Sequence, residues 1–323
     1  MYTIVIPEDI AESGKKFLRD RGYKLIVGTG NTNLESLKEL LRNADGIIAR
    51  NAAYPKEVLE EAVNLKVISR HGVGLDKIDV EYCNDNGIYI TYTPEANSLA
   101  VAEHTIGFII ALSHQFRKLD IEVRKGNWGI RNKIKTCNCN GKTLGLIGYG
   151  RIAKKVARIA VNGLGMNVIV YRSSKRVDDI MNNVEVLDSI DRVFENADFV
   201  SLHIPSTKDT VGLVDIKLMK KMKKTSFLIN TSRGNVIVEK DLYKALSEGI
   251  IAGAAVDVLD KEPPETDNPL FTMDNIIITP HCSTHTEETM DLMSLHAAMG
   301  LHSILSRSEQ QQWVANNPKK IKD

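Results

Sequence analysis

Residues Thr143–Ala153 read TLGLIGYGRIA, and this stretch decides the fold. A strand-like apolar segment, Thr143–Ile147, runs directly into the turn Gly148–Ala153, and a helical pattern follows. In such a G-x-G-x-x-A turn the first glycine permits a tight bend, the second lets the backbone approach a pyrophosphate, and the small last residue lets the helix pack on the strand. The helix N-terminus adds free N–H groups and a positive dipole. The stretch therefore predicts a dinucleotide-binding strand–turn–helix unit.

Length and composition set the class of protein. The chain has 323 residues, of which 43% are hydrophobic, and a net charge of +1. This length predicts about two domains, and the balanced charge argues against nucleic acid or an anionic membrane as partner. Because no apolar run is long enough to span a bilayer and the N-terminus reads as a strand, we expect a soluble cytoplasmic protein. The four cysteines should be reduced thiols, and the Cys137-x-Cys139 pair lacks the second pair that a metal site would need.

Strand-like and helix-like segments alternate along the whole chain, which predicts an α/β protein with parallel sheets. One helical segment, 98–116, is apolar all round and precedes the glycine turn, so we expect it to be buried and to lead into a second domain. The expected strands are 3–7, 24–27, 46–49, 66–69 and 88–91 before this helix, and 143–147, 167–171, 199–203, 226–230, 251–257 and 275–278 after it.

Polar residues follow three successive strands of the second half. Arg233 follows one strand, Glu262 the next, and His281 the last. Carboxyl ends of neighbouring parallel strands share one edge of a sheet, which is where ligands bind in doubly wound folds. Arginine can anchor a 2-oxo acid, histidine can move a proton at neutral pH, and glutamate can orient the imidazole and favour its charged form. In the first half, Arg50 also follows a strand and could reach a second anionic group, such as a phosphate.

The chain resembles the D-2-hydroxyacid dehydrogenase family, close to its phosphoglycerate dehydrogenase-like and hydroxypyruvate/glyoxylate reductase-like branches. The matching stretches cover nearly the whole length. They are His71–Asp79, Thr93-Pro94 with Asn97, Val101–His104, the glycine turn, Leu202–Pro205, Asn230–Gly234, Asp257–Pro263 and Pro280-His281. The resemblance implies two doubly wound parallel-sheet domains. A Rossmann cofactor domain, residues 98–285, would be inserted in a discontinuous flavodoxin-like substrate domain, residues 1–97 and 286–323.

The resemblance also implies roles for individual residues. Arg233, Glu262 and His281 would be the catalytic residues of an NAD(P)-dependent hydride transfer between a nicotinamide and a small D-2-hydroxy acid or 2-oxo acid. The backbone N–H groups of Val73 and Gly74 would hold the substrate carboxylate, which fits a glycine-rich anion nest. Relatives are commonly dimers through the cofactor domain, with the 98–116 helix and the arm 118–140. The implied cofactor-binding residues are Gly148, Gly150, Arg151, Ile152, His203, Pro205, Thr231 and Asp257, and the residues Arg172 and Ser173 are added to this set by a departure from the family pattern.

One departure from the family pattern concerns the choice of cofactor. About twenty residues after the turn, most members carry an acid that binds the ribose 2′-OH, whereas this chain has Arg172, followed by Ser173, Ser174, Lys175 and Arg176. Arginine cannot accept hydrogen bonds from the ribose hydroxyls but can pair with a 2′-phosphate. The sequence therefore favours NADP(H). The alternative, in which these basic residues form a solvated loop beside bound NAD(H), remains open.

The sequence leaves a second class of function open. Some family relatives are nucleotide-sensing corepressors, so a catalytically idle interaction protein is the second function class. Formate dehydrogenase-like chemistry is disfavoured, because that branch carries Gln where this chain has Pro280. Cys282 follows the expected catalytic histidine and is either a packing residue or an oxidisable thiol.

Overall fold

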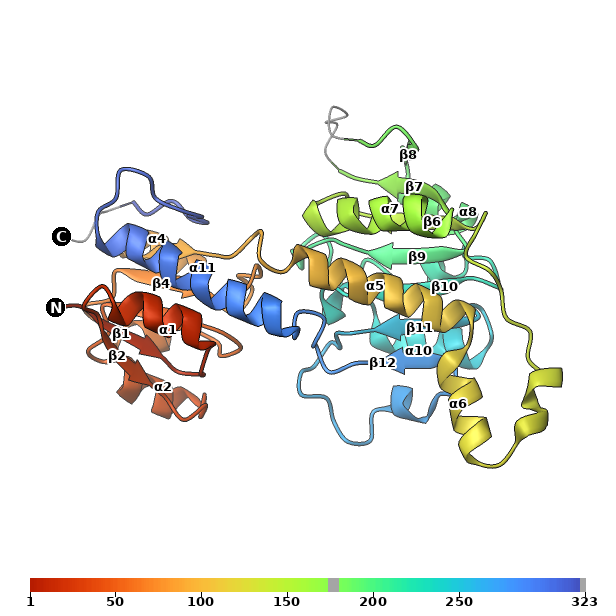
Figure 1. Ribbon diagram of the computed structural model, residues 1–323, viewed down its shortest axis with the longest axis horizontal. Helices are drawn as coiled ribbons and strands as arrows, with labels where there is room; N and C mark the ends of the chain where they lie inside the picture. Colours follow the sequence, from red (N-terminus) through yellow and green to blue (C-terminus); the bar gives the residue numbers. More distant parts are fainter. Residues whose placement is uncertain (174–179, 320–323) are drawn as a thin grey trace. The chain divides into compact units, whose positions relative to one another are not determined.

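The computed structural model describes residues 1–173 and 180–319, and it divides them between two compact units. Unit 1 comprises Met1–Asn97 with Thr284–Asp323, and unit 2 comprises Ser98–Ser283. Figure 1 traces both units, each an α/β arrangement with a parallel sheet at its centre. The predicted α/β fold with two doubly wound parallel sheets is confirmed.

Unit 1 contains a five-stranded parallel sheet in the order β2-β1-β3-β4-β5, the flavodoxin-like order. Helices cover both faces of the sheet, so its strands are apolar almost throughout. Helices α1 and α11 cover one face, and α2, α3 and α4 the other. The elements are β1 Thr3–Ile6, α1 Glu12–Arg19, β2 Lys24–Val27, α2 Leu34–Leu41, β3 Gly46–Ala49, α3 Lys56–Leu59, β4 Val67–Arg70, α4 Val80–Asp85, β5 Tyr89–Thr91 and α11 Glu287–Leu305.

Unit 2 contains a seven-stranded parallel sheet in the order β12-β11-β10-β9-β6-β7-β8. The first strand, β6, lies in the middle of the sheet, and the chain continues through β7 to the edge strand β8. It then crosses back to β9, on the other side of β6, and continues strand by strand to β12. This is the Rossmann arrangement. Its strands and associated helices are β6 Thr143–Ile147, α7 Arg151–Leu164, β7 Asn167–Tyr171, β8 Val184–Leu187, α8 Ile190–Asn196, β9 Phe199–Leu202, α9 Ile216–Met219, β10 Phe227–Asn230, η2 Gly234–Val236, α10 Glu239–Ser247, β11 Gly253–Val256, η3 Pro269–Thr272 and β12 Ile276–Ile278.

The helix predicted over 98–116 is shorter than expected. Helix α5 spans Ser98–Ser113, and Gln115 then adopts a left-handed conformation with φ of 52°. A second helix, α6 (Phe116–Arg124), and a short turn, η1 (Trp128–Asn132), form an arm that stands away from the sheet in Figure 1. Helix α5 packs on α7 and on strands β10 and β11, so its apolar side chains are largely buried as predicted.

Within the described residues, no helix is both long enough and apolar enough to cross a lipid bilayer.

Candidate active site

The glycine turn has the geometry that a dinucleotide requires. Gly148 has φ of 93°, and a Cβ on it would lie 2.5 Å from the carbonyl oxygen of His203, so only glycine fits there. Gly150 caps helix α7, and a Cβ on it would meet nothing within 4 Å. Open space beside Gly150 is what a close approach by a pyrophosphate needs, and helix α7 presents its N-terminal N–H groups to the same place.

The residues after the turn seat the helix against the sheet. Ala153 is completely buried, whereas Arg151 is exposed and Ile152 is partly buried. A larger side chain at Ala153 would push helix α7 away from β6, since both contribute to one core cluster. The turn and helix thus fit a dinucleotide.

Arg172 and Ser173 follow strand β7 directly, at the same sheet edge as the glycine turn. Arg172 is half-buried and Ser173 is exposed. A backbone hydrogen bond joins this edge of the sheet to the glycine turn, since the N–H of Gly148 donates to the carbonyl of Tyr171 at 2.8 Å. Ser174, Lys175 and Arg176, which also entered the cofactor prediction, lie outside the described residues.

His203 and Pro205 follow strand β9, which lies beside β6 on the other side from β7. The N–H of His203 donates to Ile147, and its Nε2 lies 2.9 Å from the hydroxyl of Ser201. Burial lowers the pKa of His203 to about 4, so the ring is neutral at pH 7. His203 therefore borders the glycine turn, since its carbonyl lies beside Gly148. The role of His203 and Pro205 in binding the cofactor remains a prediction.

His281 and Glu262 form a direct pair. Nδ1 of His281 lies 2.7 Å from Oε2 of Glu262, and the other carboxylate oxygen accepts a bond from the N–H of Leu259 at 3.2 Å. The imidazole remains half-exposed, with 46% of its side-chain surface accessible. The carboxylate thus fixes the ring through Nδ1 and leaves Nε2 for another hydrogen-bond partner.

Arg233 is held on a loop that packs against the Glu262 loop. Asn230, at the end of β10, donates to the carbonyl of Arg233 at 2.8 Å and accepts from the N–H and hydroxyl of Ser232. A Cβ on Gly234 would lie 2.0 Å from the carbonyl of Leu259, so the two loops touch backbone to backbone. The sequence pattern singled out Arg233, but it did not indicate that Asn230 and Gly234 hold the loop of Arg233 in position.

Asp257 organises the loop that carries His281. Its carboxylate accepts hydrogen bonds from the hydroxyl of Thr279 and from the N–H groups of Cys282 and Ser283, at 2.5 to 2.9 Å. His281 itself has φ of 51°, an uncommon conformation for a residue with a side chain, and its N–H donates to the carbonyl of Asp257. The buried carboxylate therefore stabilises a strained backbone at His281. The predicted role of Asp257 beside the nicotinamide remains a prediction.

Helix α5 contributes two contacts that sequence reasoning did not foresee. Nε2 of His104 lies 3.1 Å from the hydroxyl of Thr279, and the hydroxyl of Thr105 lies 3.0 Å from that of Thr231. Thr231 is buried, and together these contacts tie the helix to the loops after β10 and β12. The Val101–His104 motif was the available signal, but it carried no indication of these partners.

The carboxylate-binding residues predicted in unit 1 lie on the loop after β4. Val73 is exposed, Gly72 has φ of 141°, and the N–H groups of Val73 and Gly74 have no hydrogen-bond partner among the residues that the structure describes. Arg70 supports this loop, since its Nε donates to the carbonyl of Gly74 at 2.9 Å. Two adjacent amide donors at a glycine-rich turn form a concave site for an anion.

Comparison with known proteins identifies the family. Residues 106–283 match the family model described as D-isomer specific 2-hydroxyacid dehydrogenase, NAD binding domain. The chain belongs to this family. It is 38% identical over 321 residues to D-3-phosphoglycerate dehydrogenase of Methanocaldococcus jannaschii, covering 98% of this chain and 60% of that protein. It is also 38% identical to glyoxylate reductase of Thermofilum pendens, over 84% of this chain and 82% of that protein.

A solved structure extends the comparison to three dimensions. The D-lactate dehydrogenase of Aquifex aeolicus, complexed with NAD and lactic acid, superposes with a TM-score of 0.86 at 26% identity, over 98% of this chain and all of that one. The chain spans 60% and 54% of the two archaeal D-3-phosphoglycerate dehydrogenases that it matches.

The cysteines of this 2-hydroxyacid dehydrogenase family member are all free thiols. Burial and the nearby Asp257 raise the pKa of Cys282, which favours the protonated form of the thiol. Cys137 and Cys139 lie on a loop, where Cys139 donates weakly to the hydroxyl of Ser113. No group of three or more potential metal-ligating side chains occurs among the described residues.

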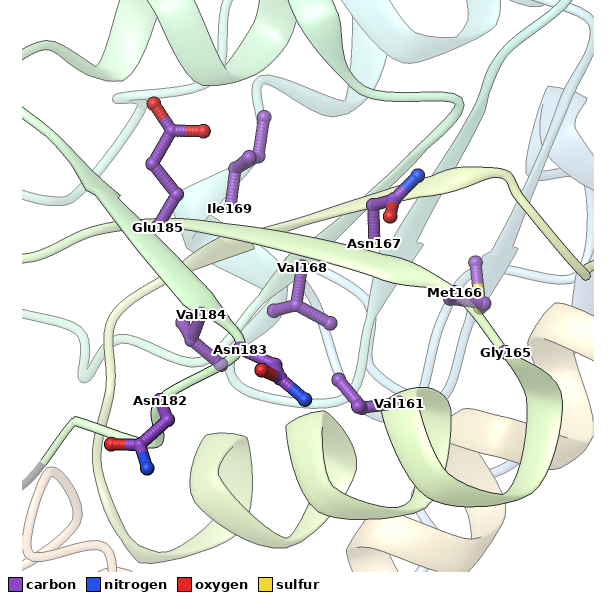
Figure 2. Close-up of a pocket in the computed structure, with 10 residues that line it drawn as sticks. All are labelled: Val161, Gly165, Met166, Asn167, Val168, Ile169, Asn182, Asn183, Val184 and Glu185. Carbon is purple, nitrogen blue, oxygen red and sulfur yellow. The ribbon is translucent and has the colours of Figure 1, made fainter.

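A cavity of about 590 Å³ lies elsewhere in unit 2, between helix α7 and strands β7 and β8. Gly165–Asn167 and Asn182–Val184 line it, so it is at the amino ends of these strands. Figure 2 shows Val161 and Val168 facing one another between helix and strand, with Ile169 and Glu185 on the other face of the sheet. The glycine turn is at the carboxyl end of β6, so this cavity is not the dinucleotide site.

Proposed function

We propose that the protein transfers a hydride between a nicotinamide cofactor and a small D-2-hydroxy acid or 2-oxo acid. The observation that carries this proposal is the 2.7 Å pair between His281 and Glu262 on a Rossmann sheet edge, with the Arg233 loop packed against the Glu262 loop. Membership of the 2-hydroxyacid dehydrogenase family supports the same chemistry.

Each residue has a distinct task in this reaction. His281 donates a proton from Nε2 to the oxygen of the 2-oxo group during reduction, and removes it again in the reverse direction. Glu262 holds the ring through Nδ1 and stabilises the imidazolium. Arg233 binds the substrate carboxylate and polarises the carbonyl. The N–H groups of Val73 and Gly74 are suited to binding a carboxylate as well. The nicotinamide, when bound, supplies or accepts the hydride.

We propose NADP(H) as the preferred cofactor. Gly148, Gly150, Arg151 and Ile152 would hold the pyrophosphate, and Arg172 with Ser173 would meet a 2′-phosphate where most relatives have an acid. His203, Pro205, Thr231 and Asp257 would line the remaining cofactor surface. The D-lactate dehydrogenase structure holds NAD, so the fold alone does not select the phosphate, and Arg172 is the reason for the choice.

A single variant tests the cofactor preference. Arg172→Asp should lower kcat/KM for NADPH and raise it for NADH, because the aspartate repels the phosphate and accepts from the ribose hydroxyls. Lys155→Asp, a charge reversal of similar size on helix α7, is the control. A wild-type preference for NADH of tenfold or more would overturn this choice.

A panel of 2-oxo acids, each assayed with both nicotinamides, tests which substrate the protein uses. We expect oxidation of NADPH with glyoxylate, hydroxypyruvate or 3-phosphohydroxypyruvate, the last being the oxidised form of 3-phosphoglycerate. No oxidation with any acid and either cofactor would contradict the proposed function. The relatives named above are dehydrogenases and reductases, and they lend no support to a catalytically idle interaction protein.

We further propose that the protein acts in the cytoplasm as a homodimer formed through unit 2. Helix α6 has no buried residue, and large apolar side chains are exposed along the arm. Phe116 is 54% exposed and Trp128 is 66% exposed. Apolar surface of this kind on an extended arm is typical of an interface.

A further inference from the structure

Two pairs of backbone N–H groups follow neighbouring strands of unit 1, and among the described residues only the first pair is hydrogen-bonded. After β3, the N–H groups of Asn51 and Ala52 both donate to Oε2 of Glu8, at 2.7 and 2.9 Å. After β4, the N–H groups of Val73 and Gly74 have no partner among the described residues. Glu8 comes from the end of β1, the other neighbour of β3.

The two pairs lie close together. Strands β3 and β4 are paired in register, with Ala49 opposite Arg70, and neighbouring strands are about 4.8 Å apart. The guanidinium of Arg70 joins the two loops, because it donates to the carbonyls of Ala49, Arg50 and His71 as well as to Gly74. These bonds fix the spacing of the two loops. A three-carbon acid bound at one pair of amides would therefore extend its far end toward the other pair of amides.

Among the described residues, no ion pair joins Arg50 to Glu8. Nη1 of Arg50 donates to the backbone carbonyl of Asp9, so the side chain is directed over the β1 loop. Glu8 and Asp9 bring two carboxylates to that loop, and Asp9 is paired with Lys15 at 2.8 Å. The amide pair that could hold a second anion is thus occupied by a carboxylate of the chain itself.

We propose that Glu8 is a specificity-determining residue that excludes substrates with a negatively charged far end. This inference rests on the proposed function and narrows its substrate class. The substrate is a 2-oxo acid of two or three carbons with an uncharged far end, such as hydroxypyruvate, and its O-phosphate ester is disfavoured. A phosphate placed beside the Glu8 carboxylate meets like charge, and the two amide donors that would stabilise it are already used.

The test compares kcat/KM for hydroxypyruvate and 3-phosphohydroxypyruvate, which differ only by the phosphate. The wild type should favour hydroxypyruvate by tenfold or more. Glu8→Gln keeps an oxygen acceptor for the two amides but removes the charge, and should raise the phosphorylated-to-free ratio at least about fivefold. Asp9→Asn is the matched control, because it removes a carboxylate one residue away that contacts neither amide, and should leave the ratio unchanged.

The outcomes separate the two proposals. Reduction of both acids with equal efficiency by the wild type, or preference for the phosphate ester, would overturn the role of Glu8 even if Glu8→Gln failed to fold. The same holds if both variants change the ratio equally or neither does. Failure to reduce either acid or glyoxylate, with either nicotinamide, would overturn the proposed function itself.

Discussion

At the scale of single residues, the His281–Glu262 pair is the most sharply defined chemical feature of the protein. Glu262→Gln removes the charge that stabilises the imidazolium while leaving an oxygen near Nδ1. We expect kcat for 2-oxo acid reduction to fall roughly 10- to 100-fold, with a much smaller change in KM, because the charge matters most when the ring is protonated.

Glu265→Gln is the control for that measurement. Glu265 lies three residues away and pairs with Lys261 on the surface, so its loss should leave kcat within about twofold. Equal kcat values for Glu262→Gln and the wild type would contradict the role assigned to Glu262.

A buried histidine predicts a pH dependence of stability. His71 is 5% exposed and bonds through Nε2 to the hydroxyl of Ser294 at 3.0 Å. Burial, with added repulsion from Arg50 and Arg70, lowers the pKa of His71 to about 3. The unfolded chain takes up a proton near pH 6.5 and the folded chain does not, so the stabilisation by neutral His71 is lost as the pH falls from 6.5 toward 3.

The variant His71→Gln isolates this contribution, since glutamine can also donate to Ser294 but does not titrate. The difference in free energy of unfolding between the wild type and the variant should shrink by up to about 1.4 kcal/mol per pH unit below pH 6. Urea titrations at pH 7.5, 6.5, 5.5 and 4.5 measure it. A difference that does not change with pH would contradict the assignment.

At the scale of elements, the loops at the carboxyl ends of β10 and β11 depend on one glycine. Gly234→Ala would place a Cβ 2.0 Å from the Leu259 carbonyl, so the Arg233 and Glu262 loops must separate. We expect a loss of about 1–3 kcal/mol in stability and a fall in kcat/KM of tenfold or more.

Gly163→Ala is the matched control, because Gly163 lies on α7 with only Ile159 nearby, at 3.9 Å. Alanine is the better helix former, so this variant should keep its activity and gain up to about 1 kcal/mol. Thermal unfolding and steady-state kinetics on both proteins provide the comparison. Unchanged activity in Gly234→Ala would show that contact between the two loops is unimportant.

Much of the fold could be predicted from the sequence, because buried parallel strands are short apolar runs and the glycine turn marks the centre of the second sheet. Strand β8 was missed: Val184–Leu187 is an edge strand with two exposed residues, so its apolar signal is weak. The break of the 98–116 helix after Ser113 was also missed, since Gln115 is not a residue that usually marks a left-handed turn.

The candidate site was predictable where a residue type carries the chemistry. Arg233, Glu262 and His281 follow successive strands and have side chains suited to carboxylate binding and proton transfer, so the pattern singled them out. The supporting contacts were not predictable in the same way. Glu8 meets the N–H groups of Asn51 and Ala52 across more than forty residues, and only the order of strands β1 and β3 brings them together.

At the scale of the whole molecule, we expect formation of the proposed dimer to depend on the arm. Trp128→Glu and Phe116→Glu, together, should convert the dimer to a monomer in sedimentation experiments, because charges replace exposed apolar side chains at the interface. Val63→Glu is the control, as Val63 is 68% exposed in unit 1. A wild-type monomer, or a dimer unaffected by the arm variants, would contradict the proposal.

The most direct test of the central claim is the turnover of His281→Ala in the reduction of a 2-oxo acid, measured beside its dissociation constant for NADPH. Loss of the proton donor should lower kcat roughly 10²- to 10⁴-fold, while the dissociation constant stays within about twofold, because the histidine lies outside the glycine turn. A variant that turns over at nearly the wild-type rate would contradict proton transfer by His281, and with it the proposed reaction.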